Sequence, residues 1–251
     1  MASAQACADA GCDLLIEKPL AASLDGVDHL ERTIAARKLR AAVAYQLRFH
    51  PAIVRMRELV CRGSLGRLVS VQAEYGQHLS AWRPTRDYRD TYTARAALGG
   101  GILLDASHEI DYVRWIGGEM QGVYAFASRL SDLDMDAEDT AALVVRFASG
   151  AIAEIHLDCV RRGYSRTCTL IGTEATVRWD VKEGLRITSA DGTTRAEPIV
   201  PEPNLPYVDE LAAFLHGAEN APLATVHDAR RVLEIVLAAR ESAARRQEVP
   251  L

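Results

Sequence analysis

Lys18 is the first residue whose position in the sequence suggests chemistry. It follows the run DLLIE at residues 13–17 and precedes Pro19. An ammonium group at the end of a buried strand can hydrogen-bond a substrate hydroxyl or its alkoxide. Partial desolvation there lowers its pKa toward a range useful for acid–base work. The alternative is that Glu17 and Lys18 are merely the polar end of a strand.

The second motif is the run GGGILLDASHEIDY at residues 99–112. A helix over residues 102–116 would place Asp105, His108 and Tyr112 on one face, because their spacing is i, i+3 and i+7. A histidine beside a carboxylate suits proton transfer, since its pKa lies near neutrality. The alternative is an exposed or core histidine with an incidental acid three residues away.

The same motif offers little support for a metal site. Histidine and carboxylate side chains can ligate Zn²⁺ or Fe(II). Asp105 and Asp111, however, lie six residues apart on poorly matched helix azimuths. His108 and Glu109 are not followed by the second histidine of a zincin motif. We therefore predict no metal. Nucleophilic catalysis is not indicated either, because the sequence has no G-x-S-x-G elbow.

The first fifty residues predict the element that positions Lys18. The run at 13–17 is of buried-strand length, a helix is expected from an N-cap at Ser23 to about residue 38, and a second strand at 40–47. Strand, helix and strand in this order indicate a parallel pair with a right-handed crossover. Ligands of such sheets bind just outside the carboxyl ends of the strands. The sequence therefore places Lys18 at a ligand-binding edge.

The remainder predicts a strand-rich region between helices. Turn signals separate several short alternating runs, which is typical of antiparallel strands. Residues 79–98 form a long polar connection, and connections of that length often carry function. Helices are expected at residues 52–61, 207–218 and 227–246, and strands at 68–78, 123–129, 140–147, 151–158, 166–171, 175–180 and 185–188.

Composition narrows the class of protein. The 251 residues carry 29 basic and 34 acidic side chains, a formal charge of −5, and no basic block stands out. Nucleic acid is therefore an unexpected partner. No window of eighteen apolar residues indicates a membrane span. The five cysteines are irregularly spaced without a C-x-x-C pair, so we predict reduced thiols and a cytoplasmic protein.

Three motifs in order resemble the Gfo/Idh/MocA family of sugar and cyclitol oxidoreductases. They are AGCDLLIEKPL at 10–20, AYQLRFHP at 44–51 and GGGILLDASHEID at 99–111, and IGTEATVRW at 171–179 is similar to a late turn of that family's C-terminal sheet. The resemblance implies an α/β fold. Residues 1–47 would be the C-terminal part of a Rossmann domain, a parallel strand-helix-strand unit. Residues 48–251 would form an α/β domain with a large, mostly antiparallel open sheet.

The resemblance also implies an activity and a set of site residues. It implies an oxidoreductase that uses NAD or NADP on a hydroxyl of a sugar, a sugar derivative or a cyclitol, and a homo-oligomer formed through the C-terminal sheet. Lys18 and His108 would be catalytic together with Asp105, although Asp105 lies three residues before the histidine where the family commonly has four. The expected cofactor contacts are Glu17, Lys18 and Pro19, and the expected substrate contacts are Arg48, Trp82, Arg83 and Tyr88.

The dinucleotide-binding turn expected of such an enzyme is missing from the sequence. A G-x-G-x-x-G run lets the pyrophosphate approach a helix N-terminus. No glycine precedes Gly11, and Leu104 occupies the last glycine position of the run that starts at Gly99. We therefore expect a truncated chain with little or no activity alone. The alternatives are a non-catalytic sugar-binding or oligomerisation module, or one subunit of a split dehydrogenase whose partner chain carries the missing half.

Overall fold

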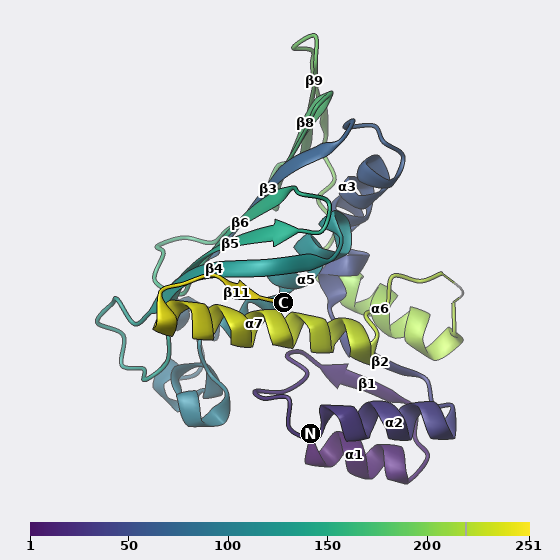
Figure 1. Ribbon diagram of the computed structural model, residues 1–251, viewed down its shortest axis with the longest axis vertical. Helices are drawn as coiled ribbons and strands as arrows, with labels where there is room; N and C mark the ends of the chain where they lie inside the picture. The colour runs from purple at the N-terminus through teal and green to yellow at the C-terminus, as the bar shows by residue number, and fades with distance from the viewer. Residues whose placement is uncertain (219) are drawn as a thin grey trace.

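The computed structural model describes residues 1–218 and 220–251 and contains two sheets. One sheet is a parallel pair near the N-terminus, and the other has nine strands. Figure 1 shows the pair with its two helices below the large sheet, and a long C-terminal helix between them. This arrangement confirms the predicted fold class.

The parallel pair is built as the sequence predicts. β1 (Leu14–Glu17) and β2 (Ala41–Ala44) run in the same direction, with Leu14 opposite Ala41 and Glu17 opposite Ala44. α2 (Val27–Arg37) connects them, and α1 (Ala2–Asp9) packs against α2. Lys18 therefore follows directly from the carboxyl end of β1.

The start of α2 corrects one prediction. Ser23 does not cap the helix, because its hydroxyl donates to the Asp25 carboxylate at 2.9 Å and accepts from the Asp25 backbone N–H at 3.3 Å. The chain enters α2 at Gly26, whose φ of 80° lies in the left-handed region. A residue with a Cβ is strained in that conformation, so glycine rather than a polar cap defines this end.

The predicted strand at 40–47 is shorter than expected. β2 ends at Ala44, and a 3₁₀ turn, η1 (Gln46–Phe49), leads into α3 (Pro51–Cys61). The Nδ1 atom of His50 accepts a hydrogen bond from the Ala52 backbone N–H at 3.2 Å and so caps α3. The boundary expected between residues 47 and 48 falls inside η1, and the division into domains stays a prediction.

The large sheet has the strand order β10-β9-β8-β7-β3-β6-β5-β4-β11. β3 lies between β6, to which it is parallel, and β7, to which it is antiparallel, and every other pairing is antiparallel. β10 and β11 were not predicted. The strands are β3 (Leu68–Gly76), β4 (Met120–Ser128), β5 (Thr140–Phe147), β6 (Ile152–Asp158), β7 (Ser165–Gly172), β8 (Ala175–Asp180), β9 (Gly184–Ser189), β10 (Thr194–Glu197) and β11 (Val249–Pro250).

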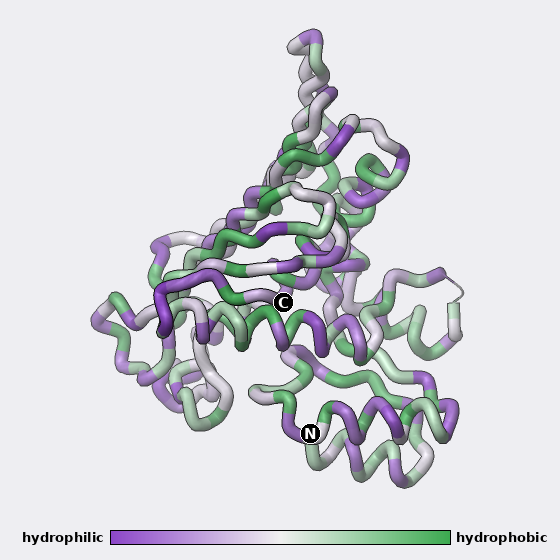
Figure 2. Tube along the Cα trace, in the orientation of Figure 1, coloured by the Kyte–Doolittle hydropathy of each residue, from purple (hydrophilic) through white to green (hydrophobic). Residues whose placement is uncertain are grey.

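Helices cover one face of this sheet. α3, α4 (Ile102–Asp105), α5 (Ser107–Gly117) and α7 (Val226–Arg245) contact its strands. The opposite face stays open (Figure 1). In β5, Leu143 and Val145 are buried under the helices, whereas Val144 between them is 50% exposed, as side chains alternate along a strand. Figure 2 shows apolar and polar residues mixed along these strands.

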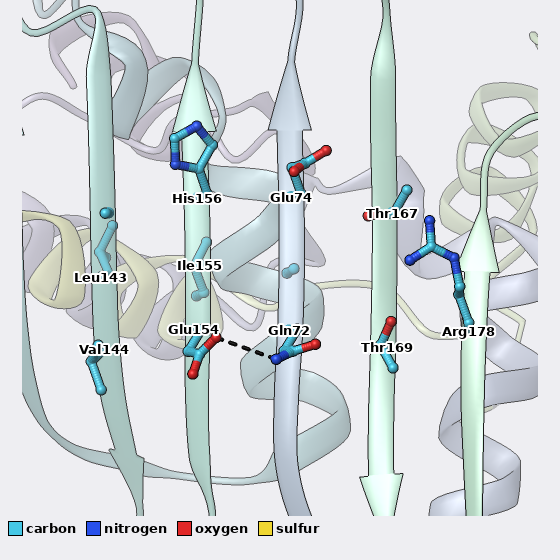
Figure 3. Close-up of a pocket in the computed structure, with 12 residues that line it drawn as sticks. Gln72, Glu74, Leu143, Val144, Glu154, Ile155, His156, Thr167, Thr169 and Arg178 are labelled. Carbon is cyan, nitrogen blue, oxygen red and sulfur yellow. Dashed lines mark hydrogen bonds between the residues drawn. The ribbon is translucent and has the colours of Figure 1, made fainter.

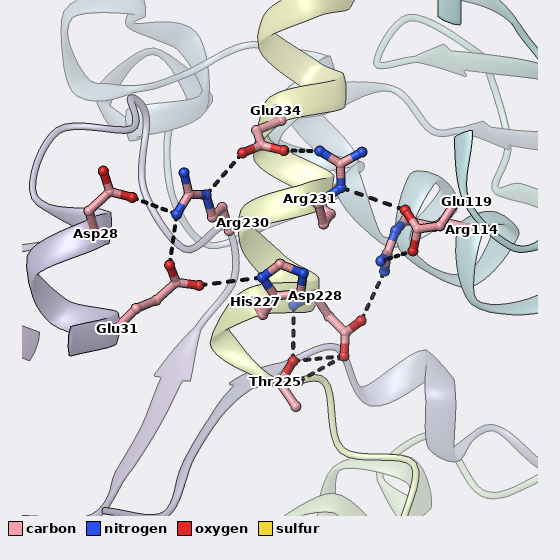
Figure 4. A network of polar contacts seen from close by, with 10 residues as sticks. All are labelled: Asp28, Glu31, Arg114, Glu119, Thr225, His227, Asp228, Arg230, Arg231 and Glu234. Atoms are coloured by element: carbon pink, nitrogen blue, oxygen red, sulfur yellow. Dashed lines mark hydrogen bonds and ion pairs between the residues drawn. The ribbon is translucent and has the colours of Figure 1, made fainter. Parts of the chain in front are cut away.

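α7 joins the parallel pair to the large sheet. It packs against β4 and β11 and also contacts β2 and α2. Arg230 of α7 reaches Asp28 and Glu31 of α2 at 2.5 and 2.8 Å (Figure 4). A capping box of Thr225 and Asp228 begins the helix. Single exposed ion pairs contribute little, so the buried apolar face of α7 must supply most of this attachment. α6 (Leu205–His216) packs beside η1.

Candidate functional site

The carboxyl end of β1 brings Lys18 to the motif at residues 99–112. The Nζ atom of Lys18 donates to the backbone carbonyl oxygen of Asp105 at 2.6 Å and lies 4.0 Å from the carboxylate atom Oδ1. The two residues are 87 positions apart in the sequence. The two motifs that suggested chemistry therefore meet in one place.

The glycines before α4 allow neighbouring segments to pack closely on its start. A Cβ on Gly100 would lie 2.3 Å from the carbonyl oxygen of Tyr92, and one on Gly101 would lie 2.4 Å from the carboxylate of Glu138. Gly101 also has a φ of 107°, which is strained for residues with a side chain. The glycines thus let the preceding loop pack directly onto the start of α4.

The predicted helix over 102–116 is interrupted at Ala106. α4 ends at Asp105 and α5 begins at Ser107, with Ala106 at φ −94° and ψ 26°. The carbonyl of Asp105 accepts from Lys18, and Glu109 N–H bonds to Ala106 instead of to Asp105. The lysine therefore takes a carbonyl that a continuous helix would use internally.

This break corrects the expectation that Tyr112 shares the reactive face. The Tyr112 ring lies 6.2 Å from Trp179 of β8 and is fully buried against the sheet. Asp105 and His108 remain near Lys18, whose charge bears on the pKa of His108. The site is therefore a lysine, a carboxylate and a histidine without Tyr112.

His108 is a buried imidazole held beside Tyr45. It is 5% exposed, and its ring centroid lies 5.5 Å from that of Tyr45 in an edge-on arrangement. Burial lowers the pKa of His108 well below its usual value, and the cations Lys18 and Arg166 add to this. Its Nδ1 atom has no hydrogen-bond partner among the described residues. These causes favour the neutral imidazole, and one of its nitrogens is buried without a partner among the described residues.

Lys18 itself is more easily deprotonated than an exposed lysine. Burial lowers its pKa, and Arg166 acts in the same direction, while Asp105 opposes the shift. Its side chain is 18% exposed and that of Asp105 is 3% exposed. The Oδ2 atom of Asp105 is buried and has no partner within the part of the chain that is described. Buried polar atoms without partners are uncommon and costly, so these atoms point to a polar ligand.

Three side chains of the site were missed in the sequence. Tyr92 donates from its hydroxyl to Asp105 Oδ1 at 2.6 Å, and no spacing in its loop predicts that contact. Arg166 and Glu109 form a buried ion pair with 2.8 Å between Nε and Oε1. Arg166 could have been found from the sequence, because it lies two residues before the core residue Cys168 in β7 and so points to the same face of the sheet.

Arg166 also lines a cavity of about 300 Å³. Its guanidinium lies 4.5 Å from the ring centroid of Tyr75. The cavity combines aromatic, amide and charged side chains with a proline-rich segment, and residues that line it include Gln46, His50, Tyr164, Arg166, Pro203 and Tyr207. Such a mixture of apolar walls and a few polar groups is typical of small-molecule sites.

The structure gives no support to substrate binding by Arg48. Its guanidinium donates to both carboxylate oxygens of Asp111, at 2.9 and 2.7 Å, and to Asp228 at 3.3 Å. The side chain is only 3% exposed. Its donors are therefore occupied by carboxylates inside the fold, and substrate binding by Arg48 stays a prediction.

The other predicted contacts are spread along the loop between β3 and α4. Trp82 donates to the Gln77 carbonyl at 2.9 Å and packs edge-on against Tyr75. Arg83 lies 5.5 Å from the ring centroid of Tyr92 and is exposed. The Tyr88 hydroxyl accepts from the Asp134 backbone N–H at 3.1 Å, so Tyr88 contacts another loop.

Glu17 and Pro19 flank Lys18 and are the remaining predicted contacts. Glu17 is exposed at the end of β1, and Pro19 is half-buried. Neither touches a group that would reveal a cofactor, so their role stays a prediction. Among residues 1–218 and 220–251, no cluster of three or more histidine, cysteine or acidic side chains could hold a metal ion. In the same residues no helix is both long and apolar enough to cross a membrane.

Comparison with known proteins adds to this geometry. The model of the GFO/IDH/MocA C-terminal domain matches residues 53–178. Myo-inositol 2-dehydrogenase of Thermotoga maritima is 26% identical over 98% of this chain and 75% of its own length. The 1,5-anhydro-D-fructose reductase of Ensifer adhaerens is 28% identical over 87% of this chain and 66% of its own length.

A solved structure shows the same fold. GenD2 from gentamicin A biosynthesis, in complex with NAD, superposes with a TM-score of 0.80 at 26% identity, covering 99% of this chain and 74% of that protein. The curated relatives are longer, and the chain spans between 44% and 75% of the length of three of them. The similarity thus extends through both sheets of this chain.

Proposed function

This chain belongs to the GFO/IDH/MocA family, and we propose that it supplies the substrate side of an NAD(P)-dependent oxidoreductase. The substrate would be a hydroxyl group of a sugar, a sugar derivative or a cyclitol. The observation that carries the proposal is the meeting of Lys18 with Asp105 and His108 from segments 87 residues apart. The substrates in the names of two relatives, myo-inositol 2-dehydrogenase and 1,5-anhydro-D-fructose reductase, agree with this substrate class.

The site residues can move a proton to and from such a hydroxyl. A lysine whose pKa is lowered by burial holds more of its neutral amine near neutral pH, and that amine accepts the hydroxyl proton. Asp105 Oδ2 and His108 Nδ1 are buried without partners and could take hydrogen bonds from the substrate. In the reverse direction the Lys18 ammonium returns the proton to the alkoxide.

The residues of this chain do not provide a complete dinucleotide site. The connection from Lys18 to the start of α2 contains one glycine, Gly26, and no G-x-G-x-x-G run occurs in the sequence. A pyrophosphate needs several backbone N–H groups at a glycine-rich turn. We therefore derive no hydride-transfer step. Glu17, Lys18 and Pro19 remain the proposed contacts on the cofactor side.

Titration calorimetry and ligand-observed NMR test this proposal. We expect weak or undetectable binding of NADH and NADPH and little dehydrogenase activity by the 251-residue chain. We expect weak binding of inositols or aldoses, which His108→Asn diminishes. Arg62→Met, an exposed change just after the end of α3, should leave this binding intact. Tight NAD(P)H binding would refute the incomplete cofactor site. Failure of every polyol to bind at high millimolar concentration would refute the substrate class.

We also propose that the open face of the large sheet pairs with a second copy. Its side chains form a shallow hollow of about 420 Å³ that includes Gln72, Glu74, Glu154, Thr169 and Arg178 (Figure 3). Exposed apolar residues accompany them, with Phe126 66% and Val144 50% exposed. A patch with both charges and apolar groups can be self-complementary across a two-fold axis. Light scattering should give at least a dimer, and Val144→Asp should reduce the mass to that of one chain. A monomeric wild type would refute this pairing.

A further inference from the structure

Lys18 bonds to the backbone of Asp105 although the carboxylate of the same residue is within reach. The Nζ atom is 2.6 Å from the carbonyl oxygen and 4.0 Å from Oδ1. Charge-assisted hydrogen bonds to a carboxylate are normally shorter and stronger than those to a neutral carbonyl. Something must therefore keep the carboxylate away from the ammonium group. The Tyr92 hydroxyl occupies Oδ1 at 2.6 Å.

We propose that Tyr92 is a positioning residue that holds the Asp105 carboxylate at its distance from Lys18. The inference rests on the proposed function, in which Lys18 transfers the proton. Tyr92 belongs to the short 3₁₀ turn η4 (Tyr92–Ala94), in the long loop between β3 and α4. It would act on the reaction through Asp105 and not by touching the substrate itself.

The backbone around Tyr92 is firmly anchored, as such a role requires. The Thr93 carbonyl accepts from the Gly101 backbone N–H at 3.0 Å, and the Tyr92 carbonyl packs so closely on Gly100 that no Cβ would fit there. Thr91 and Thr93 are both buried. The backbone of Tyr92 thus packs on the same glycines that precede α4, and its hydroxyl donates to Asp105 in that helix.

The consequence concerns the balance of charges around Lys18. Burial and Arg166 of β7 favour the neutral amine, while the acidic side chains favour the ammonium form. The titratable and charged groups around it are Asp105 at the end of α4, His108 and Glu109 on α5, Arg166 on β7, Glu17 on β1 and Tyr92 on η4. If the Asp105 carboxylate moved from 4.0 Å into hydrogen-bond contact with Lys18 Nζ, the added attraction would raise the pKa of Lys18 by about one unit.

The sequence makes this directly measurable, because it contains only three lysines, Lys18, Lys38 and Lys182. In protein labelled with ¹³C at lysine Cε, three signals titrate, and Lys18→Met identifies the first. We expect Tyr92→Phe to raise the pKa of Lys18 by about one unit. Thr91→Val is the matched control, because it removes a 2.6 Å hydrogen bond to the Tyr88 carbonyl in the same loop without touching Asp105.

A second pair of variants keeps the inference falsifiable if Tyr92→Phe is poorly folded alone. Asp105→Asn removes the carboxylate charge and should lower the pKa of Lys18. In that background, adding Tyr92→Phe should leave the titration unchanged, since Tyr92 acts through the charge on Asp105. An unchanged or lowered pKa in Tyr92→Phe, an equal shift in Thr91→Val, or a rise of the same size in the double variant would overturn the assignment.

These titrations need neither cofactor nor turnover, so they are separate from the test of the proposed function. Polyol binding by ligand-observed NMR is measured on the same samples. Absence of polyol binding with a raised Lys18 pKa in Tyr92→Phe would refute the proposed function and leave the positioning role in place. Polyol binding with an unmoved Lys18 pKa would do the reverse.

Discussion

Replacing Arg48 by methionine should strongly destabilise the fold. The guanidinium forms two hydrogen bonds to Asp111, at 2.9 and 2.7 Å, and one to Asp228 at 3.3 Å. It thereby joins η1 to α5 and to the first turn of α7. Methionine preserves much of the apolar volume and removes the charge. Asp111, whose side chain is 1% exposed, would then be a buried carboxylate without its main partner.

The expected loss in the free energy of unfolding is about 3–5 kcal/mol at pH 7, the range for breaking a buried ion pair by removing one partner. An exposed ion pair, Arg62 with Glu58, is the control for this buried one. Arg62 is 69% exposed and lies 3.9 Å from Glu58, so Arg62→Met should cost less than about 1 kcal/mol. The two substitutions are of the same chemical kind and differ in burial, since the Arg48 side chain is 3% exposed and that of Arg62 is 69% exposed.

The loss should also depend on pH. Burial raises the pKa of Asp111 even beside Arg48, and removal of Arg48 raises it further. A carboxyl whose pKa is higher in the folded protein than the unfolded value of about 3.9 binds a proton that the unfolded chain releases. The penalty in Arg48→Met therefore grows as the pH rises from about 4 to 7.

Urea unfolding at pH 4.5 and pH 7 measures these quantities. The double variant Arg48→Met with Asp111→Leu should recover a large part of the loss, because it removes both buried charges. A loss under about 1 kcal/mol at pH 7, or a double variant no more stable than the single one, would refute the reasoning. If Arg48→Met instead left stability intact and abolished polyol binding, the original assignment of Arg48 to the substrate would be restored.

Three further predictions concern single groups. His108 should remain neutral in the folded protein, because burial and two nearby cations lower its pKa well below its usual value. Its contribution to stability is present above about pH 6.5 and is lost as the pH falls. The chain has seven histidines, so His108→Asn identifies the His108 imidazole NMR signal, and titration of that signal near 6.5 would contradict the prediction. Gly101→Ala should lower the free energy of unfolding by about 2 kcal/mol or more, because φ is 107° and the Cβ would meet Glu138. Thermal unfolding measures this loss. Gly150→Ala is the control and should lower the free energy of unfolding less, because its φ is 86° and the space around it is open. Burial opposes ionisation of Asp228, but facing arginines and the N-cap hydrogen bonds lower its pKa to about 2. Its contribution to the free energy of unfolding is therefore present above about pH 4 and is lost toward pH 2. Asp228→Asn should flatten that part of an acid unfolding curve.

The strands show how far the sequence could predict the fold. Alternation of apolar and polar residues located β5 and β8 at their observed bounds and β4, β6 and β7 to within a few residues, because one face of each strand is buried and the other open. The order of the strands did not follow from alternation. β3 lies between β6 and β7, and that placement depends on contacts between distant segments.

The site was predicted where its chemistry is local and missed where it depends on distant contacts. Lys18 and His108 were found because each stands in a short motif. The break at Ala106 was missed, because at that point the Asp105 carbonyl accepts a hydrogen bond from Lys18, which is 87 residues away in the sequence. The internal partners of Arg48 were not predicted, because the sequence alone does not reveal the carboxylates that Asp111 and Asp228 bring from α5 and α7.

The position of α7 has a consequence for the order in which the ribosome completes this site. Arg240 of α7 donates to the Gly100 carbonyl at 2.9 Å and to Glu138 at 2.8 Å. Lys18 and the glycine motif are synthesised long before residue 240, so in the nascent chain they are exposed and the hydrogen bonds from Arg240 are not yet formed. Domains that must wait for a late helix spend longer with unpaired surfaces exposed. The glycine motif should therefore gain its contacts to Arg240 only when α7 has emerged and docked.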